Sequence, residues 1–110
     1  KVVAIYQPHQ NARQQEIVRE GGYRDAFDDA DEIFWLPTYL TRQDLLPNAP
    51  KPLTPDELIA NLSQKSRNVA APTELDEKLT KKIKRFIADE DLVVIIGAGP
   101  IDGWARKNLL

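Results

Sequence analysis

Short, continuous apolar runs alternate with longer polar stretches along the whole chain. The runs cover residues 2–6, 33–36, 68–71 and 92–96, and the first and last are rich in β-branched residues. Each run stops at or just before a proline or glycine, which punctuates secondary structure. Continuous apolar runs of this length are typical of strands buried on both faces of a parallel sheet.

Helices are predicted between and after these strands. Apolar residues at helical spacing or sequence signals for helix starts are found in five segments: 11–20, 23–30, 55–62, 73–89 and 102–110. Thr54 followed by Pro55 is a favourable helix start, and Thr73 is expected to cap the fourth helix. Residues 38–55 hold four of the eight prolines and show little periodicity. A long connection of this kind is usually functional or mobile.

The alternation of strands and helices predicts the fold class. It favours a three-layer, Rossmann-like α/β domain with a mainly parallel four-stranded sheet, in the order 3-2-1-4, and helices on both faces. A length of 110 residues fits one such domain. Because the chain opens directly on its first strand with no polar lead-in, we expect it to be a piece of a longer protein.

Composition excludes several classes of function. Fifteen basic and seventeen acidic residues give a net charge of −2, which argues against binding to nucleic-acid backbones or anionic membranes. There is no cysteine and one histidine, so thiolate catalysis, disulfides and Cys- or His-rich metal sites are excluded. The longest apolar run is too short to span a bilayer. We expect a soluble, cytoplasmic domain with no catalytic residue and no metal site of its own.

The predicted sheet brings two unusual loops together. Ligands of open parallel sheets bind beyond the carboxyl ends of the strands, where strand order reverses. Residues 7–13 follow the first strand and residues 97–103 follow the fourth. In the order 3-2-1-4 these strands are neighbours, so the two loops are expected to face each other across one crevice.

His9 and Arg13 are the candidate binding side chains of the first loop. They stand four residues apart and would lie on the same side of a first helical turn. A histidine and an arginine at a helix start can clamp a carboxylate or phosphate. The alternative is structural: His9 bonds a loop carbonyl, and Arg13 pairs with Glu16 or Glu20.

The second loop is rich in glycine. Gly97, Gly99 and Gly103 have a spacing one residue away from that of the dinucleotide fingerprint, and no acidic residue can follow about twenty positions later to hold a ribose. The loop is expected either to present backbone amides to an anion or to let strand and helix pack closely.

Two charged clusters also have alternative interpretations. Basic residues gather between positions 78 and 85, and acidic residues between positions 28 and 32. The first resembles a nucleic-acid patch, but acids at Glu74, Asp76 and Glu77 share the helix and favour a solvated face. The second could bind a cation, but a solvated helix end is the favoured interpretation.

Residues 7–13 and 91–101 together resemble the C-terminal domain of the Mur ligases, most of all the members that add L-alanine. The family motif Q-P-H-R-Y-T-R corresponds to residues 7–13, and the family's acidic residue and G-A-G-x-I strand end correspond to residues 91–101. The resemblance covers nearly the whole chain. Gln10 stands where the family has arginine, and Asn11 and Ala12 replace its Tyr-Thr, so the identity of the amino-acid substrate stays open.

The resemblance implies an ATP-dependent amide ligase of bacterial peptidoglycan precursor synthesis. In such enzymes the C-terminal domain, here residues 1–110, binds the incoming amino acid and closes over the ATP site of a central domain, and a third domain binds the UDP-sugar. ATP and magnesium would belong to the complete enzyme and would not bind tightly to this domain alone, so the isolated chain is expected to be inactive.

The motif positions imply which residues take part. His9, Gln10 and Arg13 would contact the substrate, and Gly97, Ala98 and Gly99 would form a nucleotide or substrate loop. Two other functions remain possible from the sequence. One is a stand-alone nucleotide- or dinucleotide-binding regulatory module that uses the glycine loop. The other is an interaction domain whose segment 38–55 docks a partner.

Overall fold

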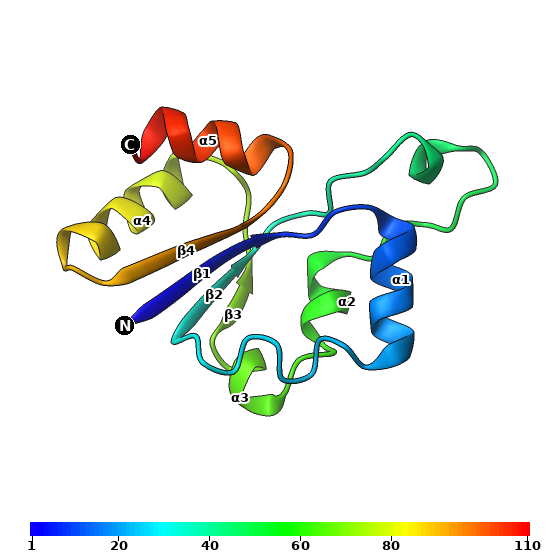
Figure 1. Cartoon of the computed structure of the whole chain (residues 1–110), viewed down its shortest axis with the longest axis horizontal. Helices are drawn as coiled ribbons and strands as arrows, with labels where there is room; N and C mark the ends of the chain where they lie inside the picture. The colour runs from blue at the N-terminus through cyan, green and yellow to red at the C-terminus, as the bar shows by residue number, and fades with distance from the viewer.

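A four-stranded, wholly parallel sheet forms the middle layer of the fold (Figure 1). The computed structural model describes all residues, 1–110. The strands are β1 (Val2–Gln7), β2 (Glu32–Trp35), β3 (Ala70–Pro72) and β4 (Leu92–Gly97), in the order β3-β2-β1-β4. The predicted fold class and strand order are therefore confirmed.

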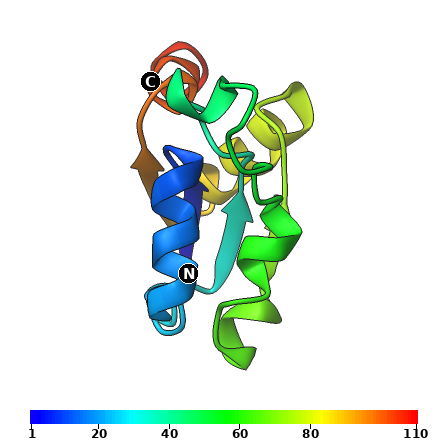
Figure 2. The ribbon, with the colours of Figure 1, turned by 90° about the vertical axis from the view of Figure 1, so that its right-hand side faces the viewer.

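Helices cover both faces of this sheet. They are α1 (Asn11–Glu20), α2 (Pro55–Ile59), α3 (Gln64–Arg67), α4 (Glu77–Ala88) and α5 (Pro100–Asn108), with one 3-10 turn, η1 (Gln43–Leu45). Helices α4 and α5 lie on one face, and α1 and α2 lie side by side on the other (Figures 1 and 2). No helix is both long enough and apolar enough to cross a membrane.

Each face of the sheet has its own apolar core. On the first face, side chains of β1 and β2 meet those of α4 and α5: Val3, Ile5, Phe34, Leu36, Leu79, Ile83 and Ile101. On the second, aromatic and aliphatic residues pack together: Tyr23, Ile33, Trp35, Leu58, Ile59 and Leu62. The two central strands supply both cores, because successive side chains point to opposite faces, and this explains their continuous apolar runs.

Strand β4 departs from the prediction of burial on both faces. It forms one edge of the sheet, and Leu92 is 60% exposed while Ile95 and Ile96 are each 39% exposed. Its other edge pairs with β1 over its full length. The apolar pattern of residues 92–96 correctly indicated a strand but gave no information on how far the helices would cover it.

The helix predicted at residues 23–30 is wrong. The segment is a series of separate turns, with bonds such as Ala26 N to Tyr23 O and Ala30 N to Phe27 O. Tyr23 and Phe27 instead surround Trp35, with ring centroids 5.2 Å and 5.4 Å from its own. Their apolar spacing therefore reflects an aromatic cluster on the sheet.

Tyr23 is fixed at the centre of this cluster by its hydroxyl. That hydroxyl donates to the side chain of Gln14 on α1 and shares a second hydrogen bond with Tyr6. Burial, and next the hydrogen bond with Tyr6, raises the pKa of Tyr23 above its usual value, so the hydroxyl stays protonated. These tertiary contacts outweigh the weak helical preference of the segment.

The start of α4 and the presence of α3 also differ from the sequence prediction. Asp76, not Thr73, caps α4: its carboxylate accepts from Leu79 N at 2.9 Å. Thr73 still belongs to the sheet pairing, because its amide donates to Trp35 O at 2.9 Å. The short helix α3, whose N-cap is Ser63, was not among the predicted helices.

Substitution of Ile83 tests the α4 face of the core. Ile83 is fully buried, so Ile83→Ala should lower the free energy of unfolding by about 2–5 kcal/mol, as lost burial and a residual cavity add. Ile87→Ala, on the same helix but 44% exposed, should cost less than about 1 kcal/mol. Urea unfolding measures both values. Equal losses at the two positions would contradict the packing of α4 described here.

Candidate functional site at the carboxyl edge of the sheet

The carboxyl ends of β1 and β4 lie side by side, as the strand order predicts. Their register pairs Gln7 with Gly97, the last residue of each strand. The loops that follow, residues 8–10 and 98–99, therefore leave the sheet at the same edge. This is the position at which open parallel sheets bind ligands.

Gly97 and Gly99 are required by contacts within the protein. Gly97 has φ +142°, and a Cβ there would lie 2.7 Å from the carbonyl oxygen of Gln7. Gly99 has φ +83°, and a Cβ there would lie 3.1 Å from the ring of Tyr39. Both positions thus combine a backbone conformation that favours glycine with a close approach of other atoms. The close contacts of the glycine loop are thus with the end of β1 and with the Tyr39 ring, whereas the sequence had suggested contacts between strand and helix.

The side chain of Gln7 connects three segments at this edge. Its Nε2 donates to Pro37 O at 3.3 Å, beyond the end of β2, and its Oε1 accepts from Ile101 N at 3.2 Å, at the start of α5. Gln7 is 7% exposed, so these bonds form away from water. One buried amide therefore fixes the ends of β1 and β2 and the first turn of α5 relative to one another.

Tyr39 lies between the two loops. Its amide donates to Pro8 O and its carbonyl accepts from Gln10 N, each at 2.8 Å. Its ring stacks on that of His9, with centroids 5.7 Å apart and planes inclined by 20°. Because Gly99 contacts the same ring, His9, Tyr39 and Gly99 form one row across the carboxyl edge, which we call the His9–Tyr39–Gly99 row.

A hollow of about 330 Å³ lies next to this row. It is lined by residues that follow β1 and β2 and by the segment before α4: Gln7, Leu36, Pro37, Thr38, Tyr39, Leu40, Glu74 and Leu75. The hydroxyl of Thr38 is buried and has no hydrogen-bond partner. Buried polar groups are normally paired, so this hydroxyl is an exception to the usual pairing.

Asp44 occupies the amino end of α1. Its carboxylate accepts from Asn11 N at 2.8 Å and Ala12 N at 3.3 Å, and from the amide of Thr41 at 2.9 Å. Burial acts to raise the pKa of Asp44, but these hydrogen bonds outweigh it and hold the pKa below its usual value. The protein's own carboxylate thus takes the anion position at this helix end, and an incoming anion must rely on side chains.

Asn11 attaches the long connection 38–54 to α1. Its Oδ1 accepts from Leu53 N at 3.0 Å, and its Nδ2 donates to Pro50 O at 3.3 Å. Asn11 is 1% exposed. Together with Asp44 it fixes a segment that has little secondary structure of its own, and the sequence analysis identified neither residue.

The three predicted side chains of the first loop lie at or next to this edge. The His9 ring is exposed and stacked on Tyr39, while its carbonyl accepts from Gln14 Nε2 at 3.0 Å. Gln10 has φ +66°, an uncommon conformation for a residue with a side chain. Arg13 forms a 3.3 Å ion pair with Glu16 on the surface of α1.

The Arg13–Glu16 pair was one of the two arrangements open from the sequence. Both side chains are about half exposed, at 53% and 49%. Exposed pairs of this kind contribute at most about 1 kcal/mol, so a ligand carboxylate can displace Glu16 at little cost. No hydrogen bond joins Arg13 to the His9 ring, and the structure leaves their joint role as a prediction.

The residues at this edge do not form a site for a triphosphate or for magnesium. No three acidic or histidine side chains gather in a group that could hold a metal ion. The amide of Ile101 at the start of α5 is bonded to Gln7, and the ring of Tyr39 covers Gly99. The residues at this edge therefore do not fit ATP with magnesium as a self-contained site.

The acidic cluster at 28–32 is used one residue at a time. Asp28 accepts hydrogen bonds from the hydroxyls of Ser63 and Ser66, and these bonds lower its pKa. Asp31 accepts from Val2 N at 2.7 Å, and Glu32 lies 3.7 Å from the Lys1 ammonium. Asp28, Asp31 and Glu32 thus each have a separate partner in the fold.

Two glycine substitutions test the packing of the second loop. Gly97→Ala should lower the free energy of unfolding by about 2 kcal/mol or more, because positive φ and the contact with Gln7 add. Gly103→Ala should instead raise it by about 0.5–1 kcal/mol, since Gly103 lies inside α5 with open space around it. Thermal unfolding of both variants gives the sign. A neutral Gly97→Ala would contradict the close approach.

The acid sensitivity of Asp44 gives a further prediction. Its folded-state pKa is lowered, so its stabilising effect is present above its unfolded pKa of about 3.9 and is lost as the pH falls through the folded value. Asp44→Asn should cost about 1–3 kcal/mol at pH 7, and the difference from the unmodified chain should shrink in acid. Asp29→Asn, an exposed control without a hydrogen bond, should change the free energy of unfolding neither at pH 7 nor in acid. A pH-independent loss at Asp44 would contradict the assignment.

The relatives found by comparison with known proteins all carry the same name. No family model matches the chain. The UDP-N-acetylmuramate–L-alanine ligases of Rhizorhabdus wittichii and Caulobacter vibrioides are each 30% identical to it over 105 residues, and that of Roseobacter denitrificans is 28% identical over 106 residues. These matches cover 96% of this chain, which spans only 21% of the length of each relative. The resemblance carried by the residues after the first and fourth strands is therefore confirmed, and the match is consistent with the C-terminal domain of a Mur ligase.

Proposed function

We propose that this chain is the C-terminal domain of an ATP-dependent Mur-type amide ligase, in which it helps to bind the incoming amino acid and to close over the ATP site. The similarity of 96% of the chain to UDP-N-acetylmuramate–L-alanine ligases carries this proposal. L-alanine is the amino acid named for those relatives, and we propose it as the substrate here. The position in bacterial peptidoglycan precursor synthesis and in the cytoplasm follows from the same similarity.

The carboxyl edge supplies the chemistry that an amino-acid carboxylate needs. The Arg13 guanidinium can exchange Glu16 for a substrate carboxylate and hold it through two parallel hydrogen bonds. His9 stands on the neighbouring loop, where its ring is exposed and its orientation is set by Tyr39. Holding the carboxylate in one place would orient the amine for attack on an activated acyl group, which is catalysis by positioning.

Gln10 stands where the family motif has arginine, so the proposed clamp has one positive charge fewer. With a neutral side chain at that position, Arg13 is the only permanent cation of the loop. Asp44 adds a negative charge at the start of the same helix and occupies two of its free amides. We therefore propose that carboxylate binding depends heavily on Arg13, and that ATP and magnesium are held by the rest of the complete enzyme and its UDP-sugar and central domains.

The alternative of a stand-alone dinucleotide-binding module has no specific support from the site. In dinucleotide-binding loops, glycine allows the close approach of a pyrophosphate. Here the corresponding contacts of Gly97 and Gly99 are made by Gln7 and Tyr39. Isothermal titration of the 110-residue chain with NAD tests this alternative, and micromolar binding that Gly99→Ala abolishes would favour it over the ligase proposal.

Kinetics of the complete ligase test the role of Arg13. Arg13→Ala should raise the KM for the amino acid by about ten- to a hundredfold, the loss expected for hydrogen bonds to a charged group, with less than about a twofold change for ATP. The matched control is Arg19→Ala, which removes the same charge from the far end of α1 and should leave both values unchanged. The isolated chain should show no ligase activity. An unchanged amino-acid KM in Arg13→Ala would refute the carboxylate role.

A further inference from the structure

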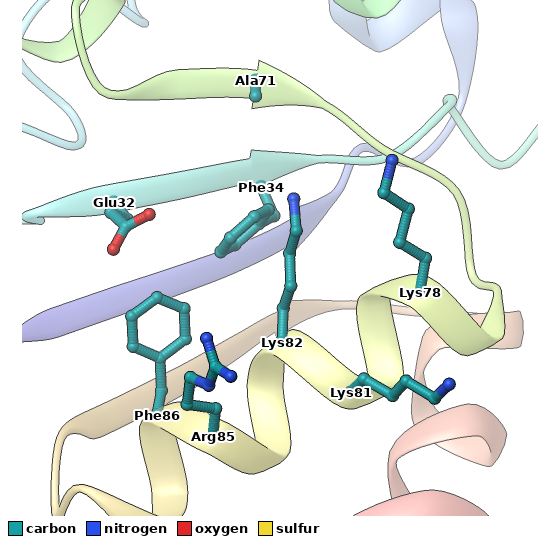
Figure 3. Close-up of a pocket in the computed structure, with 8 residues that line it drawn as sticks. All are labelled: Glu32, Phe34, Ala71, Lys78, Lys81, Lys82, Arg85 and Phe86. Atoms are coloured by element: carbon teal, nitrogen blue, oxygen red, sulfur yellow. The ribbon is translucent and has the colours of Figure 1, made fainter.

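A basic cavity of about 550 Å³ lies between α4 and the β2–β3 side of the sheet (Figure 3). Three aliphatic or aromatic residues, one acid and four cations line it: Phe34, Ala71, Phe86, Glu32, Lys78, Lys81, Lys82 and Arg85. It shares no residue with the hollow at the carboxyl edge. Helix α4 covers the centre of the sheet, and the face of the edge strand β3 beside it stays open, since Ala71 is exposed.

The four cations occupy one stripe of α4. Lys78, Lys81, Lys82 and Arg85 follow the spacing i, i+3, i+4 and i+7, which places them on one side of the helix. Lys78 and Lys82 extend toward the strands and Arg85 toward Phe86, while Lys81 runs along the helix (Figure 3). None of the four forms an ion pair. Neighbouring like charges destabilise a helix, so the repulsion within this stripe opposes helix formation.

The floor of the cavity is aromatic. The rings of Phe34 and Phe86 lie with centroids 6.3 Å apart, and the Lys82 ammonium lies 6.0 Å from the Phe34 centroid. Apolar walls reduce the screening of nearby charges by water. The one acid of the lining, Glu32, has the Lys1 ammonium at 3.7 Å. The cavity therefore carries a clear excess of positive charge in a chain whose net charge is −2.

The acids that share α4 lie elsewhere. Asp76 is bonded to the first turn of the helix, and with Glu74 it borders a separate hollow at the amino end of α4, beside Lys78 and Lys82. Glu77 faces the opposite flank, with Lys84 and Trp104. Glu32 is thus the only acid that lines the cavity itself, while Glu74 and Asp76 adjoin its Lys78 and Lys82 end and Glu77 lies on the far side of the helix.

We infer that this cavity binds a diphosphate group of a small molecule. Four cations within eight residues span about 10 Å of helix, and this density of positive charge suits a compact ligand with several negative charges. Lysine and arginine are the usual protein partners of phosphate, and arginine binds two of its oxygens at once. The volume is that of a small-ligand site. Inorganic pyrophosphate and a nucleoside diphosphate both carry the diphosphate group that the cations would bind. They differ in that only the nucleoside diphosphate has a base that could pack on the aromatic floor.

Isothermal titration of the 110-residue chain at low salt tests the inference. Pyrophosphate and ADP should both bind, and the double variant Lys82→Gln with Arg85→Gln should weaken each at least about tenfold. Lys84→Gln removes the same charge from the same helix outside the cavity and should change binding less than about twofold. Tighter binding of ADP than of pyrophosphate would identify the nucleoside as the source of the diphosphate; equal binding would identify the free anion.

Glu32→Gln supplies a test of opposite sign. Removing the only carboxylate of the lining should strengthen diphosphate binding several-fold, whereas any ligand that uses Glu32 would bind less well. The inference is overturned if neither anion binds, if Lys84→Gln weakens binding as much as the double variant, or if oligoglutamate or single-stranded RNA binds more tightly than both diphosphates. Unfolding curves confirm that each variant is folded. The result does not depend on the proposed ligase function, because no readout uses ligase activity.

Discussion

The arrangement of the carboxyl edge depends on how closely β4 approaches β1 at Gln7. The carbonyl oxygen of Gln7 lies only 2.7 Å from where a Cβ of Gly97 would be, and the buried Gln7 side chain bonds both Pro37 and Ile101. Since an unpaired buried amide is costly, these bonds hold the ends of β1 and β2 and the start of α5 in one geometry. The Tyr39 ring then contacts Gly99 and stacks on the His9 ring, and a row of residues from three separate segments results.

The architecture could be predicted because its signals are local. Continuous apolar runs identified the strands, and the order followed from general rules for parallel sheets. The helix prediction for residues 23–30 failed because an amphipathic helix and an aromatic cluster can show the same spacing of apolar residues. Only the fold shows that these side chains pack on Trp35. The exposure of β4 was equally invisible, since an edge strand and a central strand can share one apolar pattern.

The candidate site was predicted in part. The juxtaposition of the two loops followed from strand order, and Gly97 and Gly99 were recognised as special, although the reason lies in Gln7 and Tyr39. The roles of Asp44 and Asn11 were missed because their hydrogen bonds join residues more than thirty positions apart in the sequence. The one local signal is the Thr41–Asp44 spacing, which is typical of side chains that bond nearby backbone. Long-range polar contacts of this kind leave no periodic trace.

The central claim is that three chain segments meet in the His9–Tyr39–Gly99 row, and the proton spectrum of Gly99 tests it most directly. Because the Tyr39 ring lies against Gly99, the Gly99 Hα resonances should be shifted upfield, show cross-relaxation with the Tyr39 ring protons, and return toward ordinary values in Tyr39→Leu. Ordinary Gly99 Hα shifts in the unmodified chain, with no cross-relaxation to Tyr39, would contradict the assembly of this edge.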